Sequence, residues 1–332
     1  MAVTIRDVAE AAGVSPSTVS RALSMSERVI PDTRERVMRA AERLGYQPNR
    51  AARGLITGRT SNLGLLVPDL ANPFFPGVVK GVQARAREAD YAVFVADTDE
   101  DVGAEVRLAR SLVKQVDGLV LCSTRMSEAE VRALAAETTV VLLHRRVGDL
   151  PAVTVNNADG MRQALAHLAA LGHRQVGFVG GPANAWSNQE RTRGLRRAAA
   201  EADIRLVEIG NFAPYFTSGI AAADLVLAAG VTAVIAYNDL VALGLLSRLN
   251  ARGVAVPEQI SVVGCDDVPL AMMSNPAMTT VALPKEQAGR AAVSLLIKLL
   301  EEAPADATVH LELDTQLMVR GSTGPAPQRS ER

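Results

Sequence analysis

Short apolar runs alternate with amphipathic segments from about residue 61 onward, and this alternation constrains the fold more than any other feature of the sequence. Strand candidates of the first series are residues 63–67, 91–96, 118–121, 140–143 and 152–155. Those of the second series are residues 176–180, 205–209, 233–236 and 261–264. Helical patterns lie between most successive members. Two series of βα units predict two doubly wound lobes, each a parallel sheet with helices on both faces.

The two series also define the expected organisation of this part of the chain. We expect an α/β body over residues 61–320. One lobe would consist of about 61–157 and 284–311, and the other of about 158–283 and 312–320. The closing stretch "GSTGPAPQRSER", residues 321–332, predicts a disordered tail.

Polar and aromatic side chains follow several of the predicted strands. Ligands of open parallel sheets bind beyond the C-terminal strand ends, so two facing lobes would bring these side chains to one cleft. The segments concerned are Asn72–Phe75, Gly180–Pro182 with Trp186, Tyr237–Asp239, and Asp266–Asp267. Carboxylates and amides that bond hydroxyl groups, with aromatic faces beside them, suit a polyhydroxylated ring. Alternatively, Asn238 caps the following helix, and Phe74 or Phe75 belongs to the core.

Motifs of enzymes are weak or missing in this chain, so we expect no catalytic activity. The turn "GFVGGPANA" lacks the G-x-G-x-x-G spacing of a dinucleotide site, and the sequence contains no G-x-S-x-G nucleophile elbow. "GLITGRT" is one residue short of a phosphate-binding loop, has arginine in place of lysine, and follows no strand. The histidines at 144, 167, 173 and 310 lack metal-ligand spacing, so we expect neither a cofactor nor a metal.

The apolar segments also bear on location. No run reaches the roughly 20 apolar residues of a membrane helix, and the N-terminal stretch lacks the apolar core of a signal peptide. We therefore expect a cytoplasmic protein. Cys122 and Cys265 each end an apolar run and are expected to be reduced core residues.

The first sixty residues carry a different, helical pattern. Thr4 and Asp7 have the spacing of a capping box, and Gly13 is expected to end the first helix after about two turns. Ser15 can cap a second helix in which Pro16 takes the first position, where no N–H is needed. Two short helices joined by a tight turn containing glycine, with a third helix to complete the core, form a helix-turn-helix pattern.

The outward face of the second helix separates DNA binding from the alternative of an ordinary three-helix bundle. It presents Ser17, Ser20 and Arg21 rather than a mixture of glutamate and lysine. Small side chains let a helix enter a major groove, and Arg21 can bond a guanine or a phosphate. Residues 1–60 carry a net charge of +4, whereas the rest of the chain carries −5. A small basic head on a mildly acidic body favours a polyanionic partner.

The stretch "TIRDVAEAAGVSPSTVSRAL" resembles the N-terminal signature of the lactose/galactose-repressor (LacI/GalR) family of bacterial transcription factors. "TRERVMRAAERLGYQPNRAARGL" is similar to that family's third helix and hinge, and the similarity continues to about residue 320. The resemblance implies an all-α DNA-binding head over 1–47 and a hinge helix or linker over 48–60. It places Pro16, Ser17 and Arg21 where the family reads bases. The DNA-contacting set is then Thr4, Ser15, Pro16, Ser17, Thr18, Arg21, Asn49, Arg50, Arg53 and Leu55.

Pro16 and the hinge each have a physical consequence. Since Pro16 has no side-chain donor, readout there must use shape or an apolar contact. The resemblance implies that residues 49–57 become helical only on the operator, where Leu55 of each subunit enters the central minor-groove step. A segment of about nine residues is too short for a stable isolated helix, and Gly54 weakens it by roughly 1 kcal/mol relative to alanine. The alternative is a solvated linker with a chance leucine.

The body resembles the family's effector domain, which is similar to periplasmic sugar-binding proteins. Carried over by motif, Arg191 in "RTRGL" and Asp266 in "GCDDV" are the first ligand candidates. The further candidates are Asn238 in "YNDL", Phe74 in "NPFF", Phe212 in "GNFAP", and Trp186. One departure is "VNNADG", which has Asn156 where an aspartate is common, and so leaves a contact there uncharged.

These features predict a homodimeric transcriptional regulator, most simply a repressor, that binds a pseudo-palindromic operator on double-stranded DNA. A small molecule between the lobes would change how the two hinges are held. A sugar is the first choice of effector, and a purine or another metabolite is the alternative. Assembly beyond a dimer, and the direction of the effector's action, are left open. A sugar-binding transport component is the competing class, which an intact DNA-binding head on the mature protein would exclude.

Overall fold

A computed structural model describes residues 3–24, 29–46, 59–301 and 309–327. The chain divides into two compact units, Met1–Ser61 and Asn62–Arg332. None of the helices in the described parts is long and apolar enough to cross a membrane.

Three helices make up the described part of the N-terminal unit: α1 (Ile5–Ala12), α2 (Pro16–Ser24) and α3 (Pro31–Leu44). Each contributes one apolar face to a small common core. The buried residues of that core are Val8, Ala9, Ala12, Val19, Ala22, Val37, Ala40 and Ala41. The predicted helix-turn-helix arrangement is therefore confirmed.

The caps of these helices follow from the residues at their ends. The backbone N–H and the hydroxyl of Thr4 both donate to the Asp7 carboxylate at 2.7 Å. Gly13 ends α1 in the left-handed conformation that glycine adopts without strain, with φ of 65°. The Ser15 hydroxyl accepts the backbone N–H of Thr18 at 3.2 Å and so caps α2.

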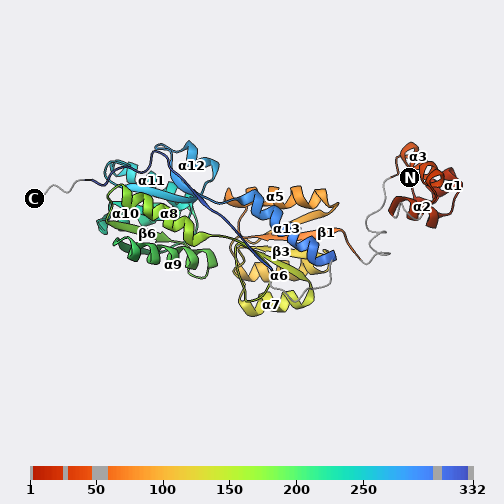
Figure 1. The fold of residues 1–332 in the computed structure, drawn as a ribbon, viewed down its shortest axis with the longest axis horizontal. Helices are drawn as coiled ribbons and strands as arrows, with labels where there is room; N and C mark the ends of the chain where they lie inside the picture. Colours follow the sequence, from red (N-terminus) through yellow and green to blue (C-terminus); the bar gives the residue numbers. More distant parts are fainter. Residues whose placement is uncertain (1–2, 25–28, 47–58, 302–308, 328–332) are drawn as a thin grey trace, which may run out of the picture. The chain divides into compact units, whose positions relative to one another are not determined.

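The first lobe of the C-terminal unit is built on a parallel six-stranded sheet in the order β11-β5-β4-β3-β1-β2. Its strands are β1 (Asn62–Val67), β2 (Ala92–Asp97), β3 (Gly118–Cys122), β4 (Thr139–Leu143), β5 (Ala152–Val155) and β11 (His310–Leu313). Helices α5 (Phe74–Glu88) and α13 (Lys285–Glu301) pack side by side on one face (Figure 1). Helices α6 (Val102–Val113) and α7 (Glu128–Glu137) cover the other face.

The second lobe repeats this plan with the strand order β12-β10-β9-β8-β6-β7. Its strands are β6 (Gln175–Gly180), β7 (Arg205–Asn211), β8 (Ala233–Ala236), β9 (Ser261–Asp266), β10 (Thr279–Ala282) and β12 (Gln316–Met318). Only the edge pair β10–β12 is antiparallel. Helices α8 (Asn157–Ala170) and α9 (Trp186–Glu201) cover one face, α10 (Phe216–Ala228) and α11 (Asp239–Ala251) the other, and α12 (Pro269–Met273) is a short helix after β9. The predicted pair of doubly wound lobes is confirmed.

The continuous apolar runs of the sequence reflect burial on both faces of each sheet. In β1, Leu63 and Leu65 belong to the core under α5 and α13, whereas Leu66 belongs to the core under α6 and α7. Strands of a sheet covered on both sides need apolar residues at every position, not only at alternate ones. Cys122 and Cys265 are free and buried in these cores, as expected.

The lobes are joined by three crossings of the chain, after β5, after β10, and between β11 and β12. They place the segments 156–157, 283–284 and 314–315 between the two sheets (Figure 1). Two of these crossings are bonded to each other, because the Thr315 hydroxyl donates to the Asn156 carbonyl at 3.2 Å.

The prediction of a disordered tail from residue 321 is wrong for residues 321–327. Ser322 is buried, donates through its hydroxyl to the Val262 carbonyl at 2.6 Å, and accepts the Thr279 N–H at 2.8 Å. The Gly324 N–H donates to the Ser261 hydroxyl at 3.1 Å. Small residues let this segment lie close against β9 and β10, so its low apolar content does not prevent it from packing. Residues 328–332 lie outside the described residues.

Candidate functional site

The outward face of α2 carries the side chains predicted to meet DNA. Pro16, Ser17 and Arg21 are exposed, whereas Val19 and Ala22 on the opposite face are buried. The Arg21 Nε donates to the Ser17 carbonyl at 3.2 Å, which leaves the ends of the guanidinium on the outward face. Asn49, Arg50, Arg53 and Leu55 lie outside the described residues. The DNA-contacting set stays a prediction.

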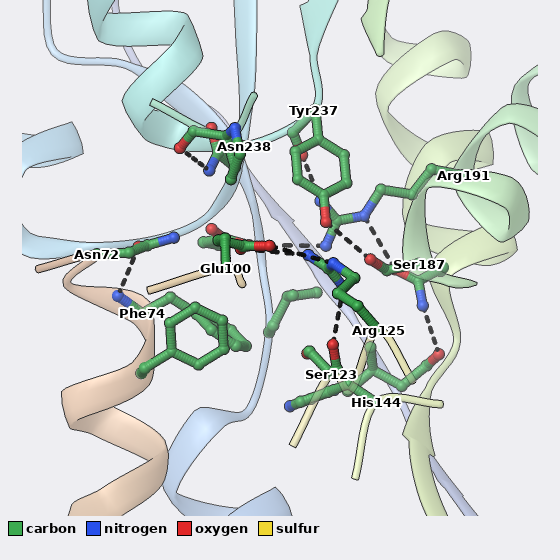
Figure 2. A pocket seen from close by; sticks show the side chains of 16 residues that line it. Asn72, Phe74, Glu100, Ser123, Arg125, His144, Ser187, Arg191, Tyr237 and Asn238 are labelled. Atoms are coloured by element: carbon green, nitrogen blue, oxygen red, sulfur yellow. Dashed lines mark hydrogen bonds and ion pairs between the residues drawn. The ribbon is translucent and has the colours of Figure 1, made fainter. Parts of the chain in front are cut away.

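A narrow cleft with about 30 Å³ of free space lies between the two lobes, at the C-terminal ends of both sets of strands (Figure 2). The residues lining it are Asn72, Phe74, Phe75, Glu100, Ser123, Arg125, His144, Val155, Asn157, Ser187, Arg191, Pro214, Tyr237, Asn238, Asp266 and Leu283. Four of the predicted effector ligands, Phe74, Arg191, Asn238 and Asp266, are brought together here, and their role in binding stays a prediction.

Arg191, on the second turn of α9, is the central cation of this cleft (Figure 2). It is buried, and its Nε donates to Asn157 Oδ1 at 3.0 Å. One terminal nitrogen donates to the Tyr237 carbonyl, and the other lies 3.6 Å from Asp266 Oδ1. Its guanidinium carbon also lies 4.9 Å from the centre of the Tyr237 ring. These contacts hold Arg191 in place before a ligand binds, and the ion pair to Asp266 is the longest of its polar contacts.

Tyr237 can occupy this place because its neighbour has no side chain. A Cβ at position 181 would lie 2.5 Å from the Tyr237 ring, so glycine is required at Gly181 for the ring to pack there. The Tyr237 hydroxyl is hydrogen-bonded to the Ser187 hydroxyl at 2.9 Å.

Asp266 closes β9 and is buried in the cleft. Burial raises the pKa of Asp266 to about 7, against the opposing charge of Arg191. The Lys285 ammonium donates to the main-chain carbonyls of Asp266 and Asp267 at 2.5 and 2.9 Å, which holds the strand end to the start of α13.

A second ion pair faces the first from the other lobe. Arg125 donates through two nitrogens to the Glu100 carboxylate, at 3.2 and 3.3 Å, and through a third to the Ser123 carbonyl at 2.8 Å. Both side chains of the pair are largely buried. Burial raises the pKa of Glu100, although Arg125 opposes that shift. The cleft therefore contains two internally paired cations.

His144 differs from its neighbours because part of its side chain is unbonded. Its Nε2 is the one buried side-chain polar atom without a hydrogen-bond partner among the residues that the structure describes. Burial, with the Arg191 charge, lowers the pKa of His144 to about 3, so the imidazole is neutral near neutral pH. Its ring lies 5.3 Å from that of Phe74, centre to centre (Figure 2). A buried, unbonded nitrogen in a cleft is a group that a ligand can satisfy.

Three of the strand-end residues have an unusual backbone. Ser123, His144 and Asp266 have φ of 49°, 59° and 123°, in the region that favours glycine. Non-glycine residues in this region store strain that tends to occur at binding sites. At the ends of β3, β4 and β9, this backbone conformation directs the side chains of the three residues into the cleft.

The alternative roles considered for Asn238 and the phenylalanines prove correct, alongside their position in the cleft. The Asn238 Oδ1 accepts the Val241 N–H at 2.9 Å and caps α11, and its amide donates to the Pro214 carbonyl at 3.0 Å. Phe74 and Phe75 pack edge to face at 5.2 Å within the main core. These residues line the cleft, but the amide oxygen and nitrogen of Asn238 each already make a hydrogen bond within the protein.

Two of the predicted residues lie beside the cleft rather than in its lining. Trp186 lines a pocket with Arg146 and Glu312 that shares Val155 and Asn157 with the cleft, and its role in binding stays a prediction. The next residue, Ser187, lines the cleft itself, because successive helical side chains point about 100° apart. Asn156 lines that same pocket and caps α8 by accepting the Asp159 N–H at 2.9 Å. The uncharged contact in the cleft that was assigned to Asn156 is made instead by the next residue, Asn157, which accepts a hydrogen bond from Arg191.

Phe212 lies in a pocket that adjoins the cleft. This outer pocket and the cleft have Glu100, Arg125 and Pro214 in common. Sequence reasoning missed Glu100, Arg125 and His144, although the last of these follows β4 directly and could have been found by the strand-end rule.

Two family models match the chain: "Bacterial regulatory proteins, lacI family" over residues 4–49, and "Periplasmic binding protein-like domain" over residues 165–323. Among curated relatives, the HTH-type transcriptional regulator CelR of Thermobifida fusca is 38% identical, over 96% of this chain and 98% of its own length.

Solved structures give the same result. A complex of transcriptional regulator CelR with cellobiose is similar with a TM-score of 0.72 and 34% identity, covering 96% of this chain and 99% of the other. The lac repressor dimer bound to operator and the anti-inducer ONPF is similar with a TM-score of 0.85 and 28% identity, covering 98% of this chain and all of the other.

Proposed function

The chain belongs to the LacI family of bacterial regulatory proteins and is thus a DNA-binding transcriptional regulator, and we propose that it is a repressor whose operator affinity is set by an uncharged sugar bound between its lobes. The named regulators that resemble it include one in complex with cellobiose and one bound to operator DNA. The cleft chemistry supports the same choice independently.

The observation that carries the proposal is the pairing of charges in the cleft. Arg191 faces Asp266, and Arg125 faces Glu100, so neither guanidinium lacks a carboxylate. An anionic effector would have to compete with a carboxylate already in place, and leaving a buried charge unpaired is costly. A neutral ligand with several hydroxyl groups can donate to the carboxylates and accept from the guanidiniums without adding a charge to the cleft. This favours a sugar over a phosphorylated metabolite.

A purine fits the same wall less well. Flat heteroaromatic ligands gain most from an aromatic face on each side. Phe74 stands edge to face with Phe75 and tilted against His144, so its ring surface is largely taken by its neighbours. The groups left for a ligand are mainly polar, as a hydroxyl-rich ring requires.

We propose that the active form is a homodimer whose two heads bind the two half-sites of a pseudo-palindromic operator. Exposed apolar side chains on α12 support this part. Leu270, Met272 and Met273 are 41%, 65% and 76% exposed, and exposed apolar patches on a monomer commonly mark an interface with another chain. The lac repressor, which this chain resembles, is a dimer on its operator.

The test is a binding screen of the purified full chain. Neutral mono- and disaccharides, sugar phosphates and nucleobases are measured by calorimetry, and each binder is then added to the protein on operator DNA. We expect a neutral sugar to bind and to change operator affinity. Binding restricted to nucleobases or sugar phosphates would refute the choice of effector.

The matched variants for this screen are Asp266→Ala in the cleft and Asp224→Ala on the outer face of α10. Asp224 also pairs with arginines, Arg248 and Arg252, but is exposed and does not line the cleft. Asp266→Ala is expected to abolish the sugar response while DNA binding persists, and Asp224→Ala to retain both. Unchanged sugar affinity in Asp266→Ala would remove Asp266 from the site.

A further inference from the structure

We propose that the chain has a second small-molecule site beside Trp186, separate from the cleft and suited to a free amino acid with an apolar or aromatic side chain. The pocket there has about 440 Å³ of free space, whereas the cleft has about 30 Å³. Arg146 and Glu312 line it from the first lobe, and Trp186 lines it from the second. This site goes beyond the proposed function, which concerns the cleft.

Two side chains of opposite charge in this pocket have no charged partner. Arg146 and Glu312 are exposed, and neither side chain makes a hydrogen bond or an ion pair in the described parts of the chain. The other charged residues of the lining, Glu190 and Arg193, are paired with each other at 2.5 Å. The charged groups left for a ligand are therefore one guanidinium and one carboxylate.

Arg146 and Glu312 lie on either side of strand β5. Arg146 follows the end of β4 by three residues, Glu312 belongs to β11, and both of these strands pair with β5. Adjacent strands lie about 4.8 Å apart, so the two flanking strands are roughly 10 Å apart. Burial lowers the pKa of His310 on β11, and the charge of Arg146 adds to that shift while the charge of Glu312 opposes it, so both charges act on one ring. A guanidinium and a carboxylate placed in this way can bind the α-carboxylate and the α-ammonium of one zwitterion.

Trp186 gives the pocket an apolar wall and a free donor. Its side chain is half-buried, and its indole N–H makes no hydrogen bond within the described residues. Val155 and Ala158 belong to the same lining. Tryptophan combines a large apolar surface with one polar N–H, so this wall suits a ligand with an apolar or aromatic side chain next to its charged groups.

The residues shared with the cleft do not merge the two sites. Val155 and Asn157 line both spaces. The Asn157 side chain is already bonded at both ends, because its Oδ1 accepts from Arg191 at 3.0 Å and its amide donates to the Val155 carbonyl at 3.2 Å. The groups that are free to bind a ligand, on Arg146, Glu312 and Trp186, line the pocket and not the cleft. A ligand can therefore occupy the pocket while the contacts of the cleft stay intact.

The experiment uses Trp186, the single tryptophan of the chain, as its reporter. The full chain is titrated with each of the common amino acids, and binding is followed by intrinsic fluorescence and by calorimetry. We expect at least one amino acid with an apolar or aromatic side chain to bind. Its N-acetyl and amide derivatives, which each lack one of the two charges, should bind about tenfold more weakly. No binding of any amino acid at millimolar concentration, or equal binding of the derivatives, would overturn the proposal.

Variants of the two exposed charged residues place the ligand, and they leave the fold intact because neither side chain is bonded. Arg146→Gln and Glu312→Gln should each lower amino-acid affinity by about tenfold. Arg107→Gln is the matched control, since it removes an exposed arginine on α6 that does not line the pocket, and it should bind as the wild type does. Unchanged affinity in Arg146→Gln and Glu312→Gln would overturn the proposal.

Asp266→Ala separates this site from the proposed function. It should bind the amino acid as the wild type does, although it should lose the response to sugar. Loss of amino-acid binding in Asp266→Ala would place the ligand in the cleft and overturn the second site. A sugar screen without a binder would refute the proposed effector, and the amino-acid titration would still decide the second site.

Discussion

His144→Phe is expected to raise the stability of the ligand-free protein and to lower its affinity for the effector. In the structure the buried His144 Nε2 has no hydrogen-bond partner among the described residues. A buried polar group without a partner costs about 1–3 kcal/mol. Phenylalanine keeps a ring beside Phe74, 5.3 Å away centre to centre, and removes that cost. The free energy of unfolding should rise by about 1 kcal/mol.

The effector-bound state should respond in the other direction. If a ligand hydroxyl bonds the Nε2, the variant loses that bond, worth about 0.5–1.5 kcal/mol, together with the relief of the unpaired nitrogen. Together these amount to about 1.5–2.5 kcal/mol, so effector affinity should fall by roughly ten- to seventyfold, since about 1.4 kcal/mol corresponds to a factor of ten. The melting temperature of the free C-terminal unit should rise by about 2–4 °C.

The assay pairs thermal unfolding without ligand with calorimetry of the sugar found by the screen. His144→Gln is the matched control, because its amide reaches about as far as Nε2 and can bond the same hydroxyl. It should retain most of the effector affinity. A purely structural histidine would behave differently: His144→Phe would leave effector affinity unchanged, and that result would refute the reasoning.

Three further expectations concern the head, the hinge and the buried acid. Arg21→Lys should lower affinity for the operator by about 1–3 kcal/mol more than for random DNA, since lysine cannot make a bidentate contact to guanine; equal losses would make Arg21 a phosphate contact. Leu55→Ala should lower operator affinity by at least about tenfold. Affinity for random DNA and its salt dependence should persist, since both depend on phosphate neutralisation. Gel-shift assays on both DNAs across a salt series are the measurement, and equal losses on both DNAs would contradict the expectation. Because burial raises the pKa of Asp266 to about 7 in the folded state, against about 3.9 unfolded, its stabilising contribution is present below pH 4 and is lost as pH rises through 7. Relative to Asp266→Asn, the wild type should lose unfolding free energy over that range. The measurement is denaturant unfolding of both proteins at each pH. The same difference in unfolding free energy at every pH would contradict the expectation.

The parts of the fold predicted correctly are those that local chemistry determines. The caps at Thr4, Gly13 and Ser15 lie within four residues of the groups they bond, so the helices of the N-terminal unit could be predicted from the sequence. The strands β10, β11 and β12 were missed. Each has only three or four residues, and two of them are sheet edges with exposed positions, so no continuous apolar run marks them.

The site was predicted as far as the strand-end rule reaches. That rule located Asp266 and Tyr237, but it could not decide between Trp186 and Ser187, because one residue of helical rotation changes which side chain faces the cleft. The same limit applies to the tail, where Ser322 packs through hydrogen bonds rather than apolar burial. Sequence patterns detect buried apolar area, and these positions are determined by geometry and polar contacts.

Some residues that line the cleft belong to the segments that join the two lobes. An effector in the cleft can therefore act directly on the contacts that set the arrangement of the lobes. Asn157, which accepts a hydrogen bond from Arg191, lies in the crossing after β5, and Leu283 lines the cleft from the crossing after β10. Lys285 joins the latter crossing to the main chain of Asp266. A ligand that competes for Arg191 or Asp266 therefore changes contacts of the segments that join the two lobes. Such differential contacts are what a two-state regulator requires, so no relay through the outer helices is needed to connect effector binding with lobe geometry.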